Sequence, residues 1–267
     1  MSNINRRDFL WFVAGGAALA VLSRCVPGAL SPGPGTPLPT EERDATGEAP
    51  PAGPTAAPKL QLLRNENRAG FYIRYYKPFP PVDIEQWALA VEGMVRYPQR
   101  LTFQDIQDLP VTTQTSRMKC VEGWSAAATW EGFRPEALVD KVEPYEGAEW
   151  VHFYSADGYY ESLALGEFLL DRVLFVYRMN DALLLPEYGA PLRLIVPAKY
   201  GYKGPKAITR IVFADKELRG YWPTVGPYST EGEVQPGYDY PLDLGGSRQV
   251  KGRGEIFYED GLESMGN

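Results

Sequence analysis

Cys120 has the widest range of possible chemical roles in the sequence. It lies in the segment RMKCVEGWSAAATWEGF, which runs from Arg117 to Phe133. Its thiol lies between the cation of Lys119 and the carboxylate of Glu122, and the chain's other cysteine is Cys25, near the N-terminus. The local sequence leaves three interpretations open. Cys120 is an inert buried cysteine, a nucleophile that needs a neighbouring base, or a soft ligand to a metal.

The rest of the chain holds few groups for other kinds of catalysis. His152 is the one histidine and falls in an expected strand, which argues against a Ser–His–Asp triad and against histidine-rich zinc or iron sites. We expect it to be a hydrogen-bonded structural residue. The sequence has no Cys-x-x-Cys-His motif for covalent haem, no P-loop, and no GxGxxG in a strand–turn–helix context. With these groups and motifs excluded, the Cys120 thiol remains as the candidate reactive group, and its three interpretations stay open at this point.

Composition and charge exclude one class of partner. The 267 residues suit one large domain or two small ones, and 44% hydrophobic and 13% aromatic residues predict a folded chain. The formal charge of −7 and the pI of about 5.0 argue against a nucleic-acid partner, because phosphate binding requires a basic face.

Residues 1–25 are expected to be an export signal. The pair Arg6–Arg7 precedes a short uncharged apolar stretch, which resembles a twin-arginine signal; a Sec signal or an uncleaved anchor is the alternative. The end of this segment resembles a lipobox whose cysteine is Cys25, although Arg24 departs from the usual small residue. Cleavage or lipidation there would leave Cys120 without a partner cysteine in a compartment that favours disulfides.

Residues 26–58 are rich in proline and small residues, which predicts a semi-rigid tether without a core; a disordered tail is the alternative. Residues 59–267 are expected to form the folded domain. A signal followed by a tether predicts a domain outside the cytoplasm, in the periplasm or at the outer face of the cytoplasmic membrane, and associated with that membrane.

The folded part is expected to be a mixed α+β domain, rich in strands and long loops. Strands are predicted over Trp87–Val95, Glu149–Ser155, Leu192–Pro197 and Ala207–Asp215, and a hairpin over Arg172–Pro186. Short helices are predicted over Leu101–Leu109, Pro135–Val142 and Leu165–Asp171. Thr102 and Asp105 have the spacing of a capping box, and Asn180–Asp181 suits a hairpin turn. The sequence after Gly220, rich in Tyr, Pro and Gly, predicts ordered loop.

Three segments resemble the sulfite oxidase superfamily of molybdopterin-dependent oxidoreductases. The stretch with Cys120, Val121, Glu122, Trp124, Ser125 and Trp130 resembles the family's molybdenum-ligand segment, in wording closest to the periplasmic protein-methionine-sulfoxide reductase catalytic subunits. The stretch YGAPLRLIVPAKYGYKGPKAITRI, Tyr188 to Ile211, resembles the cofactor-clamping segment. The stretch FYIRYYKPFP, Phe71 to Pro80, is similar to the N-terminal cofactor strand. The similar segments occur in the family's order between Phe71 and Trp222.

The resemblance implies a sulfite-oxidase-type fold, a Mo-molybdopterin cofactor and a role for each matched residue. Cys120 becomes the catalytic thiolate ligand to molybdenum, and Arg193 binds the phosphate of the pyranopterin, for which a planar guanidinium is suited. The cofactor-binding residues implied are Tyr72, Arg74, Cys120, Ser155, Tyr188, Arg193, Lys203, Gly204, Pro205 and Lys206. Gly204 would allow close backbone approach to the cofactor, and Lys206 would supply a positive charge.

Two positions depart from the family's pattern. Arg74 is followed by Tyr75 and Tyr76 where sulfite oxidases carry Arg-Asn-His, and Tyr188 replaces the Asn or His usual before GAP-x-R. The resemblance therefore implies a pocket that copies neither subgroup. The segment after Trp222 is too short for the immunoglobulin-like dimerisation domain of many sulfite oxidases, so a monomer without that domain is expected.

The function implied is that of an exported oxidoreductase. Its cofactor would transfer an oxygen atom and two electrons on a small S-oxo or N-oxo compound or a peptide sulfoxide, or would oxidise sulfite. The alternative is a tethered binding module that keeps the fold without an active metal. The sequence has no motif for haem, an iron–sulfur cluster or flavin, so an external redox partner is expected, a membrane haem protein or cytochrome c.

Overall fold

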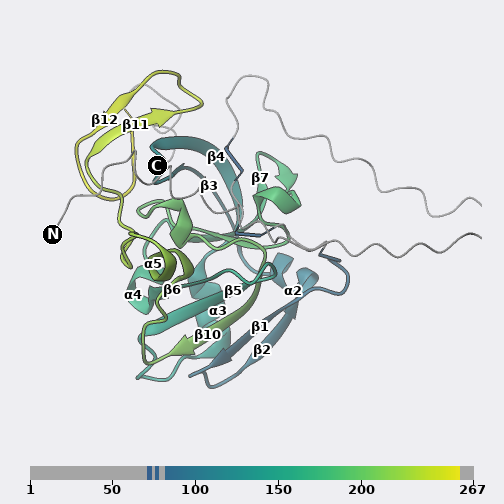
Figure 1. Ribbon diagram of the computed structural model, residues 1–267. Coiled ribbons are helices and arrows are strands. Elements are labelled where there is room, and N and C mark those ends of the chain that lie inside the picture. Colours follow the sequence, from purple (N-terminus) through teal and green to yellow (C-terminus); the bar gives the residue numbers. More distant parts are fainter. Residues whose placement is uncertain (1–70, 74–75, 78–81, 259–267) are drawn as a thin grey trace, which may run out of the picture. The chain divides into compact units, whose positions relative to one another are not determined.

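The computed structural model describes residues 71–73, 76–77 and 82–258. The expected signal over residues 1–25, the expected tether over residues 26–58 and the candidate residue Arg74 lie outside these ranges. Two β-sheets and a few short helices make up the described part (Figure 1). No helix in this part is both long and apolar enough to cross a membrane.

The first sheet has five strands in the order β2-β1-β10-β5-β6. They are β2 (Gln99–Thr102), β1 (Ala88–Gly93), β10 (Ile208–Ala214), β5 (Trp150–Ser155) and β6 (Tyr160–Ala164). β1 and β10 run parallel, and the other neighbours are antiparallel. Buried residues alternate with less buried ones along β1 and β5, as the period of a strand requires. The buried side, with Leu89, Phe153 and Phe213, contributes to the main hydrophobic core.

The second sheet has seven strands, and a long hairpin lies at its centre. The strands are β3 (Val111–Lys119), β4 (Trp124–Phe133), β7 (Leu174–Met179), β8 (Ala182–Leu183), β9 (Arg193–Ile195), β11 (Gly237–Pro241) and β12 (Arg248–Val250). β3 and β4 pair without a register shift from Val111 opposite Phe133 to Lys119 opposite Ser125. The turn that joins them contains Cys120.

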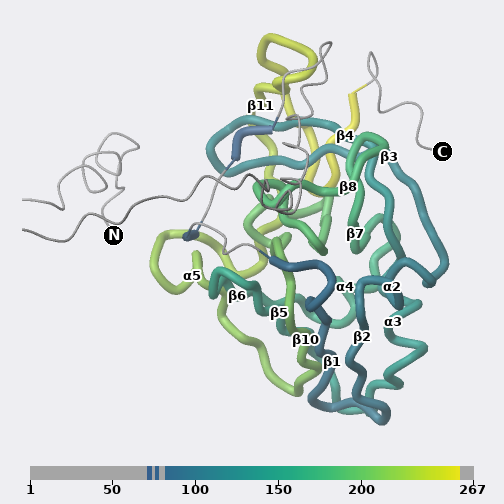
Figure 2. The backbone as a smooth tube through the Cα atoms, turned by 90° about the vertical axis from the view of Figure 1, so that its right-hand side faces the viewer, coloured from purple at the N-terminus to yellow at the C-terminus, as the bar shows by residue number. Residues whose placement is uncertain are grey.

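The C-terminal strands complete this sheet next to that turn. β11 pairs in parallel with the start of β4, with Tyr240 opposite Trp124 and Pro241 opposite Ser125, and β12 pairs antiparallel with β11. Both views show the C-terminal strands beside β3 and β4 (Figures 1 and 2). The sequence predicted loop here, and that prediction is wrong for residues 237–241 and 248–250, which are strands.

The helices in the described part are short and connect the strands. They are α2 (Phe103–Gln107), α3 (Pro135–Val142), α4 (Leu165–Phe168) and α5 (Tyr221–Val225), with 3₁₀ turns η1 (Pro186–Tyr188) and η2 (Gly201–Lys203). The predicted capping box of α2 is confirmed, since Thr102 Oγ1 accepts from the Asp105 backbone N–H and the Asp105 carboxylate accepts from the Thr102 backbone N–H. α3 has the predicted bounds, and α2 and α4 are shorter than predicted.

The predicted α+β class, rich in strands, is confirmed. Each predicted strand contains an observed strand within its bounds, and the hairpin turn at Asn180–Asp181 has both residues at positive φ. His152 lies on β5, where its Nε2 is 2.7 Å from the backbone oxygen of Lys216, so it is the hydrogen-bonded strand residue that was expected. The β3–β4 hairpin was not predicted, because β3 (VTTQTSRMK) has few apolar residues to mark it as a strand.

Candidate cofactor site

A cavity of about 250 Å³ lies where the β3–β4 turn, η1, η2 and the segment around α5 come together. Its wall is rich in aromatic residues, with Phe71, Tyr72, Tyr76, Trp124, Tyr159, Tyr188, Tyr202, Trp222 and Tyr228. It also holds charged side chains of both signs, with Arg193 and Lys206 among the cations and Glu122, Asp157 and Glu187 among the carboxylates. A volume of this size with a few polar groups suits one small-molecule ligand or cofactor.

Cys120 lines the cavity from the turn between β3 and β4. Its backbone N–H donates to the Trp124 carbonyl at 2.8 Å, and the Gly123 N–H donates to the Cys120 carbonyl at 3.1 Å. Gly123 has φ of +100°, which a residue with a Cβ rarely adopts. The turn therefore fixes the backbone on both sides of the thiol. Within the described residues Cys120 is in no disulfide.

The Cys120 thiol has a carboxylate next to it. Sγ lies 3.7 Å from Glu122 Oε2, and the Trp124 indole N–H donates to the same oxygen at 3.1 Å. Across the cavity wall, burial raises the pKa of Tyr228, and the charges of Cys120 and Glu122 raise it further. The surroundings of the thiol are therefore aromatic, with the Glu122 carboxylate next to the sulfur.

Arg193, on β9, is a buried cation with neutral hydrogen-bond partners. One terminal nitrogen donates to the Tyr188 carbonyl at 2.9 Å and the other lies 3.3 Å from Met118 Sδ, while Nε has no hydrogen-bond partner among the described residues. No carboxylate in the described part forms an ion pair with it, and burial alone lowers the pKa of Arg193 to about 10. A buried guanidinium in this state lacks a counter-charge, and a phosphate of a bound cofactor supplies one.

Lys206 adds a second cation beside Arg193. Its Nζ donates to the Glu187 carbonyl at 3.1 Å. Burial lowers the pKa of Lys206 to about 7, and repulsion from Arg193 lowers it further. Gly189, at φ of +106°, makes room for both side chains, because a Cβ there would lie 2.8 Å from Lys206 Cβ and 3.2 Å from Arg193 Cβ. Two neighbouring cations that repel one another in a cavity favour an anionic group between them.

Seven residues predicted from the sequence meet at this cavity. They are Tyr72, Cys120, Tyr188, Arg193, Gly204, Pro205 and Lys206. Gly204 is needed for a reason other than the one expected. A Cβ on it would lie 2.6 Å from the Leu194 carbonyl oxygen, so the close approach at this position is to β9. The donor set fits molybdopterin, with a soft thiolate for the metal and two buried cations for the phosphate.

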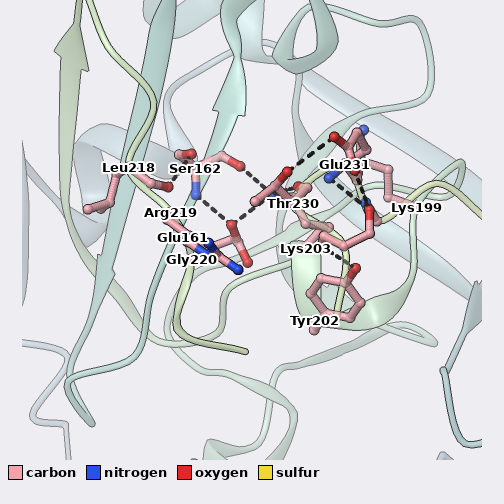
Figure 3. Close-up of polar contacts among 12 residues, drawn as sticks. Glu161, Ser162, Lys199, Tyr202, Lys203, Leu218, Arg219, Gly220, Thr230 and Glu231 are labelled. Atoms are coloured by element: carbon pink, nitrogen blue, oxygen red, sulfur yellow. Dashed lines mark hydrogen bonds and ion pairs between the residues drawn. The ribbon is translucent and has the colours of Figure 1, made fainter. Parts of the chain in front are cut away.

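Lys203 does not line the cavity, although it was predicted to bind the cofactor. Its Nζ donates to Glu161 Oε1, the Ser162 carbonyl and the Thr230 carbonyl, each at 2.7 Å (Figure 3). η2 ends at Lys203, and its ammonium reaches β6, where the fully buried Glu161 supplies the counter-charge. Its contacts tie the segment after α5 to the first sheet.

Two further predicted residues are also not placed in the cavity wall. Ser155, at the end of β5, is buried outside the lining, and its Oγ has no hydrogen-bond partner among the described residues. Arg74 lies outside the described ranges. Both roles stay predictions.

Part of the cavity wall comes from residues outside the three matched segments, which the sequence did not reveal. Trp222 and Tyr228 lie on and after α5, with ring centroids 5.6 Å apart, and Tyr202 lies 5.5 Å from Tyr228. Asp157 and Tyr159 come from the turn between β5 and β6. The density of tyrosine and tryptophan after Gly220 was the available signal, and it was interpreted as loop that covers the domain.

Three comparisons with known proteins bear on the family and the fold. A family model described as the oxidoreductase molybdopterin binding domain matches residues 76–222. Catalytic subunits of protein-methionine-sulfoxide reductase, MsrP, from Ralstonia nicotianae and Burkholderia mallei are each 34% identical over 173 residues, which is 58% of this chain and 52% of theirs. This chain thus spans about half the length of those relatives.

One solved structure has a similar fold at low identity. The sulfane dehydrogenase SoxCD from Paracoccus pantotrophus matches with a TM-score of 0.55 and 20% identity, over 67% of this chain and 48% of that one. The predicted sulfite-oxidase-type architecture is therefore confirmed.

Proposed function

The chain belongs to the family of oxidoreductase molybdopterin binding domains, and on that premise we propose that it reduces sulfoxides by two-electron oxygen-atom transfer at a molybdenum cofactor. The observation that carries the proposal is Arg193, a buried guanidinium that has no carboxylate partner among the described residues, in the same cavity as the Cys120 thiol. A cation that the fold leaves uncompensated marks the position of an anionic ligand, and the phosphate of molybdopterin is such a ligand.

Different residues of the cavity would bind different parts of the cofactor. Arg193 and Lys206 would hold the phosphate, and the Cys120 thiolate would ligate the metal. Tyr72 and Tyr188 would contact the pterin from the cavity wall. When bound, the molybdenum centre supplies two-electron oxygen-atom transfer. The protein orients the cofactor and, through its aromatic wall, keeps water from the site.

We propose that the substrate is a sulfoxide or a related neutral S-oxo or N-oxo group, including the oxidised methionine of a peptide. Glu122, Asp157 and Glu187 line the cavity, and their charges oppose entry of an anion such as sulfite. The aromatic wall suits a thioether or sulfoxide, since sulfur packs favourably against aromatic rings. Two of the relatives compared are named as reductases of methionine sulfoxide in proteins, which supports the same direction.

The reaction needs electrons and protons from outside the chain. One sulfoxide takes up two electrons and two protons, its S–O bond breaks, and the products are the thioether and one water molecule. A membrane haem protein or a cytochrome c is the proposed electron donor. A non-catalytic binding module is less well supported, because such a module has no need of a thiol and two buried cations in one cavity.

An activity screen tests the proposal directly. Full-length protein made in a host that produces molybdopterin would be assayed with a reduced viologen dye against methionine sulfoxide, a peptide that contains it, and trimethylamine N-oxide. Sulfite oxidation would be followed with ferricyanide. We expect one molybdenum per chain and faster turnover of the sulfoxides than of sulfite. Protein without molybdenum, or a preference for sulfite, would overturn the proposal.

We further propose that the protein is exported in folded form by its twin-arginine signal, because that route allows the cofactor to be inserted first. Replacing both Arg6 and Arg7 by lysine is expected to hold the precursor in the cytoplasm with molybdenum bound. Cell fractionation with molybdenum analysis of each fraction measures this. Normal export of the double variant would show that the signal is of the Sec type.

A further inference from the structure

The C-terminal strand β11 supports the turn that carries Cys120, and we propose that Asp239 on this strand is a positioning residue for the Cys120 thiolate. The proposal rests on the proposed function only in taking Cys120 as the metal ligand. Asp239 is fully buried and does not line the cavity. It acts through the residues on either side of the thiol.

The Asp239 carboxylate joins both strands of the hairpin. Its Oδ1 accepts from Lys119 Nζ at 2.5 Å, and Lys119 directly precedes Cys120. Its Oδ2 accepts from the hydroxyl of Ser125 at the start of β4 and from the Tyr258 hydroxyl at 2.6 Å. One carboxylate thus holds the last residue of β3 and the second residue of β4, between which the turn lies.

The turn itself receives two donors because β11 is in place. The Gly123 carbonyl accepts from Lys119 Nζ at 2.9 Å and from the Tyr240 backbone N–H at 3.0 Å. Lys119 Nζ can point at this carbonyl because Asp239 lies beside it and neutralises its charge. Without the carboxylate, a buried ammonium would have to find water or another partner, and the turn would lose one of its two supports.

This arrangement also changes the interpretation of Lys119. In the sequence it appears as a neighbouring cation that could favour the thiolate. In the structure its ammonium forms an ion pair with Asp239, with both side chains at most 5% exposed. Lys119 therefore acts on Cys120 by holding the backbone of the turn in place. Asp239 and Tyr258 lie beyond residues 76–222, the range that the family model matches, so this support is additional to the matched segments.

The test compares two buried lysine–carboxylate pairs in one protein. Asp239→Asn removes the charge that holds Lys119, and Glu161→Gln removes the charge that holds Lys203, whose pair is equally buried and does not touch the turn. Both substitutions would be made in the full chain with Cys25→Ser, so that Cys120 is its one thiol. The rate of alkylation of Cys120 by iodoacetamide would be measured on cofactor-free protein across pH, up to the plateau where the thiol is fully ionised.

We expect Asp239→Asn to raise the plateau rate by about tenfold. This corresponds to a loss of about 1.4 kcal/mol in the free energy that holds the turn in its ordered conformation. The plateau rate reports access to sulfur and not its ionisation, and Glu161→Gln is expected to leave it unchanged at similar thermal stability. Equal plateau rates in the two variants would overturn the proposal.

A milder variant covers the case in which Asp239→Asn does not fold. Tyr258→Phe keeps the ring and the ion pair but removes one hydrogen bond to Asp239, and we expect a smaller rise of the plateau rate in the same direction. No rise in this variant would count against the proposal. In the molybdenum-loaded protein, Asp239→Asn should also shift the electron paramagnetic resonance signal of Mo(V). A parent protein that contains no molybdenum would contradict the proposed function and leave the alkylation result intact.

Discussion

Two buried arginines of the second sheet, Arg117 on β3 and Arg193 on β9, differ in the partners that the fold gives them. Arg117 forms two bonds to Asp243, at 2.6 and 3.0 Å, and neither side chain is exposed. Arg193 has a carbonyl and a thioether sulfur as partners. Arg117 has its counter-charge in Asp243, and Arg193 has no carboxylate partner in the part of the chain that the structure describes.

The difference separates cations that stabilise the structure from cations that bind a ligand. A paired, buried cation such as Arg117 connects β3 to the C-terminal segment. A buried cation without a carboxylate costs stability, because its desolvation is not compensated, and it persists where a ligand supplies the missing charge. Lys203 and Lys206 lie three residues apart and differ in position, since Lys203 pairs with Glu161 away from the cavity and Lys206 lines the cavity.

The largest effect on activity is expected from a ligand residue that contributes little to stability. Cys120→Ser should lower the proposed sulfoxide reductase activity by more than about 100-fold, beyond the range of changes in the outer shell of a metal site. The free energy of unfolding should stay within about 1 kcal/mol, since serine is similar in size. Dye-linked turnover and chemical denaturation measure the two quantities. Full activity of this variant would remove Cys120 from the mechanism.

Arg117→Met should have the largest effect on stability. It leaves Asp243 buried without its partner, so we expect a loss of about 3–5 kcal/mol in the free energy of unfolding. Denaturation of the cofactor-free protein by urea measures it. If the variant is as stable as the parent, this ion pair does not hold the C-terminal segment, and the contrast between the two arginines fails.

Arg193→Met should have the opposite pattern. The cofactor-free protein should be as stable as the parent or slightly more stable, because an uncompensated buried charge is removed. Retention of molybdopterin should fall by about 10- to 100-fold, because the loss of one or two charge-assisted hydrogen bonds weakens binding by about this factor. Cofactor content after dialysis and urea denaturation are the two measurements. Destabilisation as large as that of Arg117→Met would contradict the assignment.

A further expected effect is a pH dependence of stability that arises from Lys206. Its pKa in the folded protein is lowered to about 7 from 10.5, so between these values the unfolded chain binds more protons than the folded one. Cofactor-free protein should therefore gain stability as pH rises through this window. Lys206→Met should remove this part of the slope. A bound phosphate group should also weaken it, by stabilising the charged ammonium. Thermal melts at several pH values test both expectations.

The sequence was sufficient to predict that Cys120, Arg193 and Lys206 contribute to one site, because each lies in a long segment with a recognisable pattern. It could not separate Lys203 from Lys206. Both fall in KYGYKGPK, and the direction of each side chain depends on η2 and on Glu161, about 40 residues earlier in the chain.

The support of the Cys120 turn was also beyond sequence reasoning. Gln114, Ser116, Arg117 and Lys119 make β3 polar, and polar residues argue against a buried strand. They are tolerated there because Asp239 and Asp243 neutralise the two cations from more than 110 residues away. No local pattern reports a pairing of that kind. The strand β11 was missed for the same reason, since its partner β4 lies far away in sequence, and β12 pairs only with β11.

The parallel docking of β11 on β4 has a consequence for the order in which the domain assembles. The β3–β4 hairpin is local and can form early, whereas its contacts with β11 close a loop of more than 100 residues, which is entropically costly and therefore slow. Until β11 docks, the hairpin carries two uncompensated cations next to the turn. When folding proceeds from the N-terminus, its last step is therefore the docking of β11, the strand that fixes the Cys120 thiol.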